Sequence, residues 1–302
     1  MKRYLVITGG LGNQLFQLAG AMSSTNDQIN VVSCLGQPRL FNGELEISRL
    51  DLSGRAAFLK CNKRHYLSIR IYSLLLSSVT RRQYLHKNLL TRYLILALGS
   101  FVLSVHLKSF VWPRVSIGIG FDNEFKYRHG NIFIGYFQSF NQINQVRDTL
   151  IDAFRKILPI DSIKDFDPPD LVIHSRLGDY RSEIHFGTLG SEYFSKALES
   201  VSHFNNPKNI WLFSDEPELA ITLIPEAYRD KLCVVGGSDD SPLKLIATML
   251  KGKSFIISNS TFSWWSAFLS QGNIVIAPRP WFAEGKTPNL LIPETWIQIN
   301  RQ

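Results

Sequence analysis

Short apolar runs in the second half of the chain alternate with stretches of helical periodicity. The apolar runs cover residues 171–173, 210–213, 232–235, 255–257 and 274–277, and the helical stretches cover 192–201, 216–223, 242–250 and 262–270. Strands that alternate with helices in this way are typical of a doubly wound parallel sheet. Ligands of such sheets bind beyond the carboxyl ends of the strands, so the residues directly after each run are the first candidates for a site.

The first half of the chain opens with the same kind of pattern and then loses its regularity. A strand is predicted at 3–8, a glycine-rich turn at 9–13, a helix at 14–22 and a second strand at 29–34, which together form a βαβ unit. Residues 66–107 favour helix, 132–136 favour a strand and 142–156 favour a helix. The polar segment 161–170 contains Pro168-Pro169 and is the expected linker. We therefore predict two domains, residues 1–165 and residues 166–302.

Composition excludes several classes of protein. With 302 residues, 45% of them apolar and 19% charged, the chain is neither disordered nor dependent on disulfides for a core. Its three cysteines are far apart and form no CxxC pair, which favours reduced thiols in a cytoplasmic protein. The apolar run at 93–107 is shorter than the ~20 residues of a membrane span, and the run at 4–7 is too short for a secretory signal.

The net charge of +8 comes from one region. Between Leu52 and Phe121 there is no acidic residue, and the rest of the chain carries 22 basic against 25 acidic residues. Such a region suits an anionic membrane face or nucleic acid, and the alternative is a solvated basic face on ordinary helices. Its eleven basic residues are Arg55, Lys60, Lys63, Arg64, Arg70, Arg81, Arg82, Lys87, Arg92, Lys108 and Arg114.

The turn after the first strand reads Gly9-Gly10-Leu11-Gly12-Asn13. It is not a dinucleotide fingerprint, because Leu15 occupies the position of the last glycine, and it lacks the lysine of a P-loop. Glycines before a helix still allow a bound group to approach the backbone amides. The alternative interpretation is a tight strand–helix turn without a ligand.

Polar residues follow three of the predicted strands in the second half. Arg176, with His174 and Asp179 beside it, suits a phosphate; the alternatives are an Arg–Asp pair that holds the loop, or His174 as a base. Asp215 could contact a ligand hydroxyl or amide. Ser260 and Thr261 precede a helix, where they could cap it or, together with Arg176, hold a diphosphate.

A metal site has little support in the sequence. The seven histidines show no ligand spacing with cysteine or carboxylate. One Asp-x-Asp sequence exists, Asp165-Phe166-Asp167, but no predicted strand leads into it. We expect no metal and no other cofactor.

Three motifs occur in order along the chain. They are Gly9-Gly10-Leu11-Gly12-Asn13-Gln14-Leu15-Phe16-Gln17, His174-Ser175-Arg176-Leu177-Gly178-Asp179-Tyr180 and Asn259-Ser260-Thr261-Phe262-Ser263-Trp264-Trp265. Together they resemble the bacterial α-1,2-fucosyltransferases of glycosyltransferase family 11. The resemblance implies a GT-B type fold, with two facing Rossmann-like domains: an acceptor-side domain at 1–165 that carries the basic helical insertion, and a GDP-sugar-binding domain at 166–302. It implies transfer of L-fucose from GDP-fucose to the 2-hydroxyl of a galactoside, with inversion and without a metal.

The resemblance also implies partners and roles. Arg176, supported by His174, would stabilise the leaving diphosphate, while Asp179 would act as base or, in our preferred interpretation, hold Arg176. The acceptor is expected to be a galactose-containing glycan, often lipid-linked in O-antigen or other surface-polysaccharide assembly, which places the enzyme on an anionic cytoplasmic membrane face and away from nucleic acid. The expected donor-binding residues are Gly10, Gly12, Asn13, Asp215, Asn259, Ser260, Thr261 and Phe262.

Two departures from the family pattern matter. Leu177 stands where the second motif usually has another arginine, and Leu245 stands where an aspartate is common, with Asp239 and Asp240 slightly upstream. Two other classes remain open: a GT-B transferase that uses a different nucleotide sugar, and a non-catalytic module that binds phosphates or nucleic acid.

Overall fold

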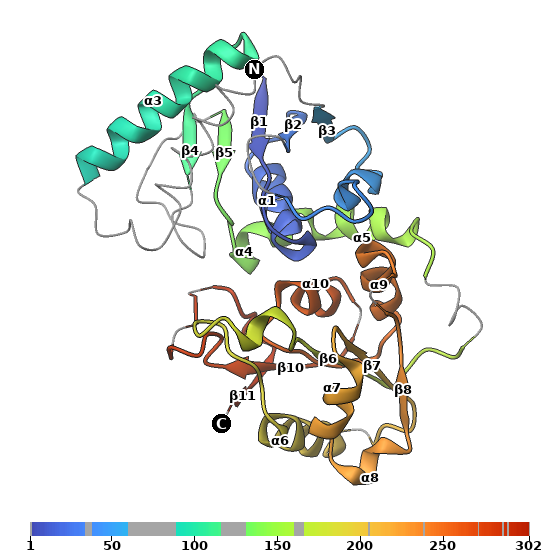
Figure 1. Cartoon of the computed structure of the whole chain (residues 1–302). Coiled ribbons are helices and arrows are strands. Elements are labelled where there is room, and N and C mark those ends of the chain that lie inside the picture. Colours follow the sequence, from blue (N-terminus) through green and yellow to red (C-terminus); the bar gives the residue numbers. More distant parts are fainter. Residues whose placement is uncertain are drawn as a thin grey trace. The chain divides into compact units, whose positions relative to one another are not determined.

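The computed structural model describes most of the chain as two compact units (Figure 1). One unit contains Met1–Thr149 and Asn289–Leu291, and the other contains Leu150–Pro288 and Ile292–Gln302. The predicted boundary after residue 165 adjoins residues 160–165, which lie outside the described residues, so it stays a prediction. The structure describes residues 2–33, 38–59, 89–115, 131–159, 166–204, 206–237, 239–270, 272–285, 287–288 and 290–301.

The first unit is built on a five-stranded parallel sheet with the strand order β3-β2-β1-β5-β4. The predicted βαβ unit is confirmed, because strand β1, helix α1 and strand β2 follow one another as expected. Gly20 of α1 lies against Phe137, so closely that a Cβ atom at residue 20 would be 2.5 Å from the Phe137 Cβ. The bounds of the strands are β1 Arg3–Val6, β2 Ile29–Val32, β3 Ala56–Leu59, β4 Pro113–Val115 and β5 Ile132–Ile134.

The helices of the first unit agree partly with the sequence pattern. Of the helix predicted over 66–107, residues 66–88 lie outside the described residues, and helix α3 covers Leu89–Leu107. The helix predicted at 142–156 is instead divided into α4 (Phe140–Ile143), a 3-10 turn (Asn144–Val146) and α5 (Arg147–Arg155), whose end enters the second unit. Helix α1 spans Leu11–Ser23, and a 3-10 helix spans Glu46–Arg49.

The second unit has a six-stranded parallel sheet with the order β11-β10-β9-β6-β7-β8. All five predicted strands are confirmed, and β11 (Ile297–Asn300) extends the sheet at its edge. The other strands are β6 Leu171–Ser175, β7 Ile210–Ser214, β8 Leu232–Val234, β9 Ser254–Ile256 and β10 Ile274–Arg279.

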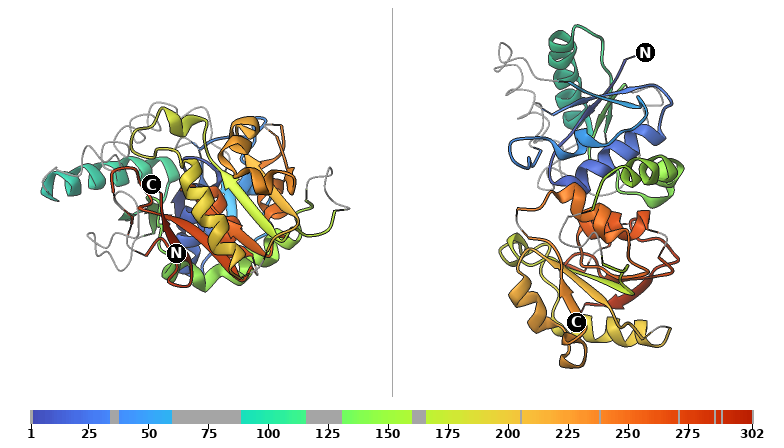
Figure 2. Two further views of the ribbon diagram at one scale, coloured as in Figure 1. Left: turned by 90° about the horizontal axis from the view of Figure 1, so that it is seen from below. Right: turned by 90° about the vertical axis from the view of Figure 1, so that its right-hand side faces the viewer.

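Helices lie on both faces of this sheet, as Figures 1 and 2 show. Tyr193 and Leu198 of α6 and Ala220 of α7 belong to the buried cluster on one face, while α9 and α10 lie together on the other. Trp264 and Trp265 are fully buried and belong to the core. The helices are α6 Ser191–Ser202, α7 Pro217–Leu223, α8 Glu226–Arg229, α9 Pro242–Met249 and α10 Thr261–Leu269.

Each sheet has a point where the strand order reverses. In the second unit the chain runs from β6 outward through β7 and β8 and then returns to β9 on the other side of β6. In the first unit β1 lies in the same way between β2 and β5. Loops that leave neighbouring strands in opposite directions open a crevice at such points, so the carboxyl ends of β6, β9 and β1 are the places where these folds bind ligands.

Candidate functional site

The candidate site residues of the second unit come together at the carboxyl ends of β6, β7 and β9. His174 lies near the end of β6, and its Nδ1 is 2.8 Å from Oγ of Ser258, which follows β9. The His174 ring also packs against Phe262 of α10, with 5.7 Å between ring centroids. The predicted loops after β6 and β9 therefore meet through side-chain contacts at the point where the strand order reverses.

His174 is held as a neutral imidazole. Burial of the ring, with a smaller contribution from the nearby Arg176 cation, lowers its pKa from 6.5 to about 3. A base with so low a pKa takes up a proton weakly near neutral pH. The environment thus argues against His174 as the catalytic base and favours a neutral hydrogen-bonding group.

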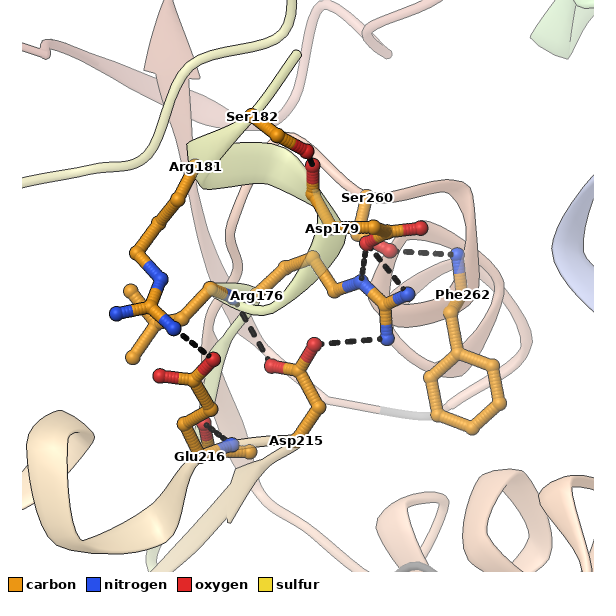
Figure 3. Close-up of polar contacts among 10 residues, drawn as sticks. Arg176, Asp179, Arg181, Ser182, Asp215, Glu216, Ser260 and Phe262 are labelled. Atoms are coloured by element: carbon orange, nitrogen blue, oxygen red, sulfur yellow. Dashed lines mark hydrogen bonds and ion pairs between the residues drawn. The ribbon is translucent and has the colours of Figure 1, made fainter.

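Arg176 is clamped between two carboxylates, as Figure 3 shows. Its Nε and Nη2 donate to Oδ1 of Asp179 at 3.0 and 2.7 Å, and its Nη1 is 3.1 Å from Oδ2 of Asp215. The guanidinium also lies over the ring of Tyr180, 5.6 Å from its centroid. Because a guanidinium has five N–H groups, these contacts leave two N–H groups for a ligand and hold the fork in one orientation.

Asp215 also shapes the turn that follows β6. Its Oδ1 accepts a hydrogen bond from the backbone N–H of Leu177 at 2.9 Å, so both of its oxygens contact the β6 loop. A Cβ atom at Gly178 would be 2.5 Å from Oδ2 of Asp215, so the carboxylate approaches this closely because residue 178 is glycine. Asp215 thus anchors Arg176, and the ligand contact expected for it stays a prediction.

Leu177 occupies the position where the second motif usually has another arginine, and Arg181 is a further arginine of the same loop. The Leu177 side chain is buried in the core of the second unit. Arg181, at the end of the 3-10 helix Asp179–Arg181, pairs through Nη2 with Oε1 of Glu216 at 2.5 Å. In Figure 3 this guanidinium extends to the side of the loop opposite Arg176. The site therefore presents one clamped arginine toward the start of α10.

The turn after β9 starts α10 as an N-cap. Oγ of Ser260 accepts a hydrogen bond from the Phe262 N–H at 3.3 Å, so the capping interpretation holds for this residue. Thr261 and Phe262 form the first turn of the helix, whose amides and dipole favour an anion. The same turn thus satisfies local geometry and places a positive helix end beside the β6 loop.

Asn259 holds the loop between the 3-10 helix and α6. Its Nδ2 donates to the carbonyls of Phe186 and Gly187 at 2.9 and 3.3 Å, so its amino group is engaged within the protein. Arg301, which the sequence pattern did not single out, donates to the carbonyls of Phe186 and Thr188 at 3.0 and 3.2 Å. The buried Arg301 guanidinium, whose pKa is lowered by burial, and Asn259 together fix a loop that begins at Asp179.

The remaining three candidate residues belong to the first unit, in the turn between β1 and α1. Gly10 is the N-cap of α1, and Gly12 is buried in its first turn. The Asn13 Oδ1 accepts a hydrogen bond from Nε2 of Gln138 at 3.2 Å. The Nε2 of Gln14 stabilises the turn by donating a hydrogen bond to the Gly9 carbonyl at 2.8 Å. A Cβ atom at Gly10 would have no neighbour within 4 Å, so the turn is open on this side.

Two further expectations concern the Asp-x-Asp sequence as a metal site and the aspartate that the family often has where Leu245 stands in this chain. Asp165 lies outside the described residues, and no cluster of three potential metal ligands occurs among the residues that are described. Leu245 packs beside Gly236, while Oδ2 of Asp240 accepts a hydrogen bond from the Gly237 N–H at 2.9 Å. Asp240 therefore closes the loop after β8, close in sequence to the position where the family often has its aspartate.

Two parallel α/β units with polar loops at their reversal points are the arrangement of a GT-B fold, and comparison with a solved structure agrees. The E. coli ADP-heptose lps heptosyltransferase II superposes with a TM-score of 0.51 at 8% sequence identity, over 99% of this chain and 90% of that chain. At this identity the likeness shows the fold alone. The predicted GT-B class is confirmed, and the facing arrangement of its two domains stays a prediction.

The sequence comparisons identify the family. The model of "Glycosyl transferase family 11" matches residues 3–299, so this chain belongs to glycosyltransferase family 11. One relative, the E. coli O-antigen biosynthesis glycosyltransferase WbnK, is 27% identical over 98% of this chain and 100% of that protein. An E. coli alpha-1,2-colitosyltransferase is 27% identical over 56% of this chain and 62% of that protein.

Several residues of the site were missed from the sequence. Ser258 directly follows a predicted strand, and Arg181 and Glu216 lie in loops that had been singled out, so position alone could have suggested all three. Arg301 gave no such signal, because it follows a strand that was not predicted and contacts a loop more than 100 residues away.

The residues described include no helix that is both long and apolar enough to cross a membrane.

Proposed function

We propose that this family 11 glycosyltransferase moves L-fucose from GDP-fucose to the 2-hydroxyl of a galactoside, in the assembly of O-antigen or another surface polysaccharide. The observation that carries the proposal is the Arg176 guanidinium, fixed by Asp179 and Asp215 at the point where the strand order of the second sheet reverses. The relative named as an O-antigen glycosyltransferase, which matches along nearly the whole chain, supports the biological setting.

The proposed reaction requires the protein to stabilise the negative charge that develops on GDP. The acceptor oxygen attacks carbon 1 of fucose and loses its proton to a base, while the bond from carbon 1 to the phosphate oxygen breaks and its electron pair stays on GDP. Arg176, through its two remaining N–H groups, and the amides at the start of α10 would stabilise this negative charge. His174, neutral and buried beside Phe262, contributes a hydrogen-bonding group without adding charge.

Charge balance assigns a role to Asp179. Arg176 with Asp179 and Asp215 sums to −1, which opposes the approach of a diphosphate. Asp179 is the more exposed carboxylate, at 44% against 24% for Asp215, and it lies on a single 3-10 turn. We infer that Asp215 holds Arg176 throughout, and that Asp179 gives up its two contacts when the phosphates bind.

In this proposal no metal ion or other cofactor takes part. Arg176 and the positive end of α10 supply the charge that a divalent cation would otherwise provide to the leaving diphosphate. Gly10, Gly12 and Asn13 are proposed to contact the sugar of the donor or the acceptor, because the open turn at Gly10 lets another molecule reach the backbone.

One observation favours a second donor. A relative is named as an alpha-1,2-colitosyltransferase, and colitose is fucose without its 3-hydroxyl. A site that hydrogen-bonds the 3-hydroxyl would discriminate against colitose by a factor of ~10⁴ or more, whereas an apolar contact at that position would discriminate by ~10²-fold or less. The two donors therefore define two clearly separated outcomes.

The test is transfer from GDP-fucose, GDP-colitose and GDP-mannose to a panel of β-galactosides, with the linkage of each product determined by NMR. The proposal predicts an α-1,2-linked fucosyl product and a preference for GDP-fucose. Preferred transfer from GDP-colitose would retain the mechanism and change the donor. If GDP raises the melting temperature but none of these donors is used, the proposed reaction is wrong. A melting temperature raised by a single-stranded oligonucleotide and not by GDP would favour the non-catalytic alternative.

A further inference from the structure

Helix α3 presents apolar side chains on the face that does not pack against its sheet. Leu90, Leu94, Leu98, Phe101 and Val105 follow one another at intervals of three or four residues, so they form one stripe along the helix. Each of these side chains is between 54% and 67% exposed. We call these five residues the α3 stripe.

The opposite face of α3 accounts for its attachment to the first unit. Ser100 and Leu103 are buried, and the helix lies beside the edge strand β4 (Figure 1). The helix thus carries apolar side chains on both faces, and among the described residues only one of these faces is covered. A continuous exposed apolar surface on a protein usually marks a place where another molecule binds.

The charge around α3 indicates what that molecule is. The helix contains no acidic residue, and it lies in the region from Leu52 to Phe121 that carries eleven basic residues and no acidic one. The exposed Lys108 and Phe110 continue both features just beyond the end of the helix. A second copy of the chain would bring two cationic regions together, whereas an anionic surface would neutralise one.

The sequence of the helix bears on whether it crosses a bilayer or lies on it. Helix α3 has 19 residues but includes Arg92, Ser104 and His106, and no helix in the described part of the chain combines the length and apolarity of a membrane span. A helix with an apolar face and nearby cations lies in the plane of the interface and inserts its side chains among the lipid headgroups. Apolar insertion and cationic attraction then act together, which stable peripheral binding requires.

We propose that the α3 stripe docks the enzyme on an anionic lipid surface, with Phe101 and Val105 inserted and the exposed Lys108 over the headgroups. This inference does not depend on the proposed donor or acceptor, because it concerns a surface of the first unit that carries none of the candidate site residues. If the α3 stripe docks in this way, the binding of the enzyme to anionic lipid should weaken as the salt concentration rises.

The test is flotation of the full chain with vesicles, without donor or acceptor. One set of vesicles is phosphatidylcholine alone, and the other is a two-to-one mixture of phosphatidylcholine and phosphatidylglycerol. We expect binding to the mixed vesicles at low salt, with weak binding to phosphatidylcholine and release at high salt. The double variant F101E/V105E should bind the mixed vesicles at least about tenfold more weakly.

The chain offers a matched control in the second unit. Phe204 is 66% exposed against 67% for Phe101, and Leu158 is an exposed aliphatic residue like Val105. F204E/L158E makes the same change in charge and apolarity, and it should bind vesicles within about twofold of the unchanged protein. Circular dichroism melting of both double variants reports whether either has lost its fold. Because all four side chains are exposed, we expect both variants to fold.

Three outcomes would overturn the proposal. The first is that the unchanged protein does not bind the mixed vesicles at low salt. The second is that both double variants lose binding equally, which would make the effect one of net charge. The third is a dimer in sedimentation that F101E/V105E separates into monomers, without vesicle binding by the unchanged protein, because the stripe would then bind a second copy.

Discussion

The geometry of the site gives its sharpest prediction for the replacement of Arg176 by alanine. The variant loses the two N–H groups left for the phosphates and leaves Asp179 and Asp215 without their shared cation. Loss of one preorganised charge-stabilising group costs ~3–4 kcal/mol in the transition state, so kcat should fall by a factor of ~10²–10³. Because both carboxylates remain partly solvated, we expect the free energy of unfolding to fall by less than ~2 kcal/mol.

The assay is steady-state release of GDP from GDP-fucose in the presence of a galactoside, combined with urea unfolding. Arg181→Ala is the matched control, because it removes an arginine of the same loop that is also paired with a carboxylate but is 56% exposed and turned away from α10. It should keep kcat within about threefold. The reasoning is refuted if Arg176→Ala keeps kcat within tenfold, or if the two variants lose activity equally.

Three other predictions test separate features of the chain. His174 has a pKa of about 3 in the folded state against 6.5 in the unfolded chain, so the unfolded chain takes up its proton first as the pH falls. The free energy of unfolding should therefore decline from about pH 6.5 toward pH 3, by ~2 kcal/mol at about pH 5. Urea unfolding of His174→Asn should lack this contribution to the fall of stability with pH. Gly10→Ala should lower the melting temperature only slightly, because alanine is a poorer N-cap for α1 but its Cβ meets nothing within 4 Å. It should nevertheless lose turnover, because a substrate is proposed to approach this turn, and unchanged turnover would remove Gly10 from the site. Gly20→Ala should lower the melting temperature measurably, since its Cβ would lie 2.5 Å from the Phe137 Cβ, and an unchanged melting temperature would contradict the packing described for α1.

The second sheet could be predicted closely because its central strands β6, β7, β9 and β10 are largely buried, and because the edge strand β8 is apolar in sequence although it is partly exposed. Strands of that kind give continuous apolar runs, and all five predicted runs coincide with β6 to β10. Strand β11 was missed because it lies at the edge of the sheet and alternates in burial, so its sequence Ile-Gln-Ile-Asn contains no apolar run. The predicted helix at 142–156 is interrupted by a 3-10 turn at Asn144–Val146, which its periodicity did not indicate.

The candidate site could be located but its internal contacts could not. The strand pattern and the composition of the loops after the strands placed His174, Arg176 and Ser260 at one edge of a sheet, and in the structure His174 of β6 contacts Ser258 and Phe262, which follow β9. Which partner each side chain takes depends on three-dimensional packing. The ligand contact expected of Asp215 stays a prediction, while the space beside Gly178 lets this carboxylate reach Arg176 and the Leu177 amide, contacts that the sequence did not indicate.

Acceptor-dependent release of GDP from GDP-fucose, with and without EDTA, is the decisive assay for the proposed mechanism. We expect release that requires a galactoside and continues unchanged in EDTA, because Arg176 and the start of α10 are proposed to stabilise the leaving group. Release that stops in EDTA and returns with Mg²⁺ or Mn²⁺ would contradict that mechanism and direct attention to Asp165 and Asp167. The absence of release with every galactoside, despite binding of GDP, would contradict the proposed transfer itself.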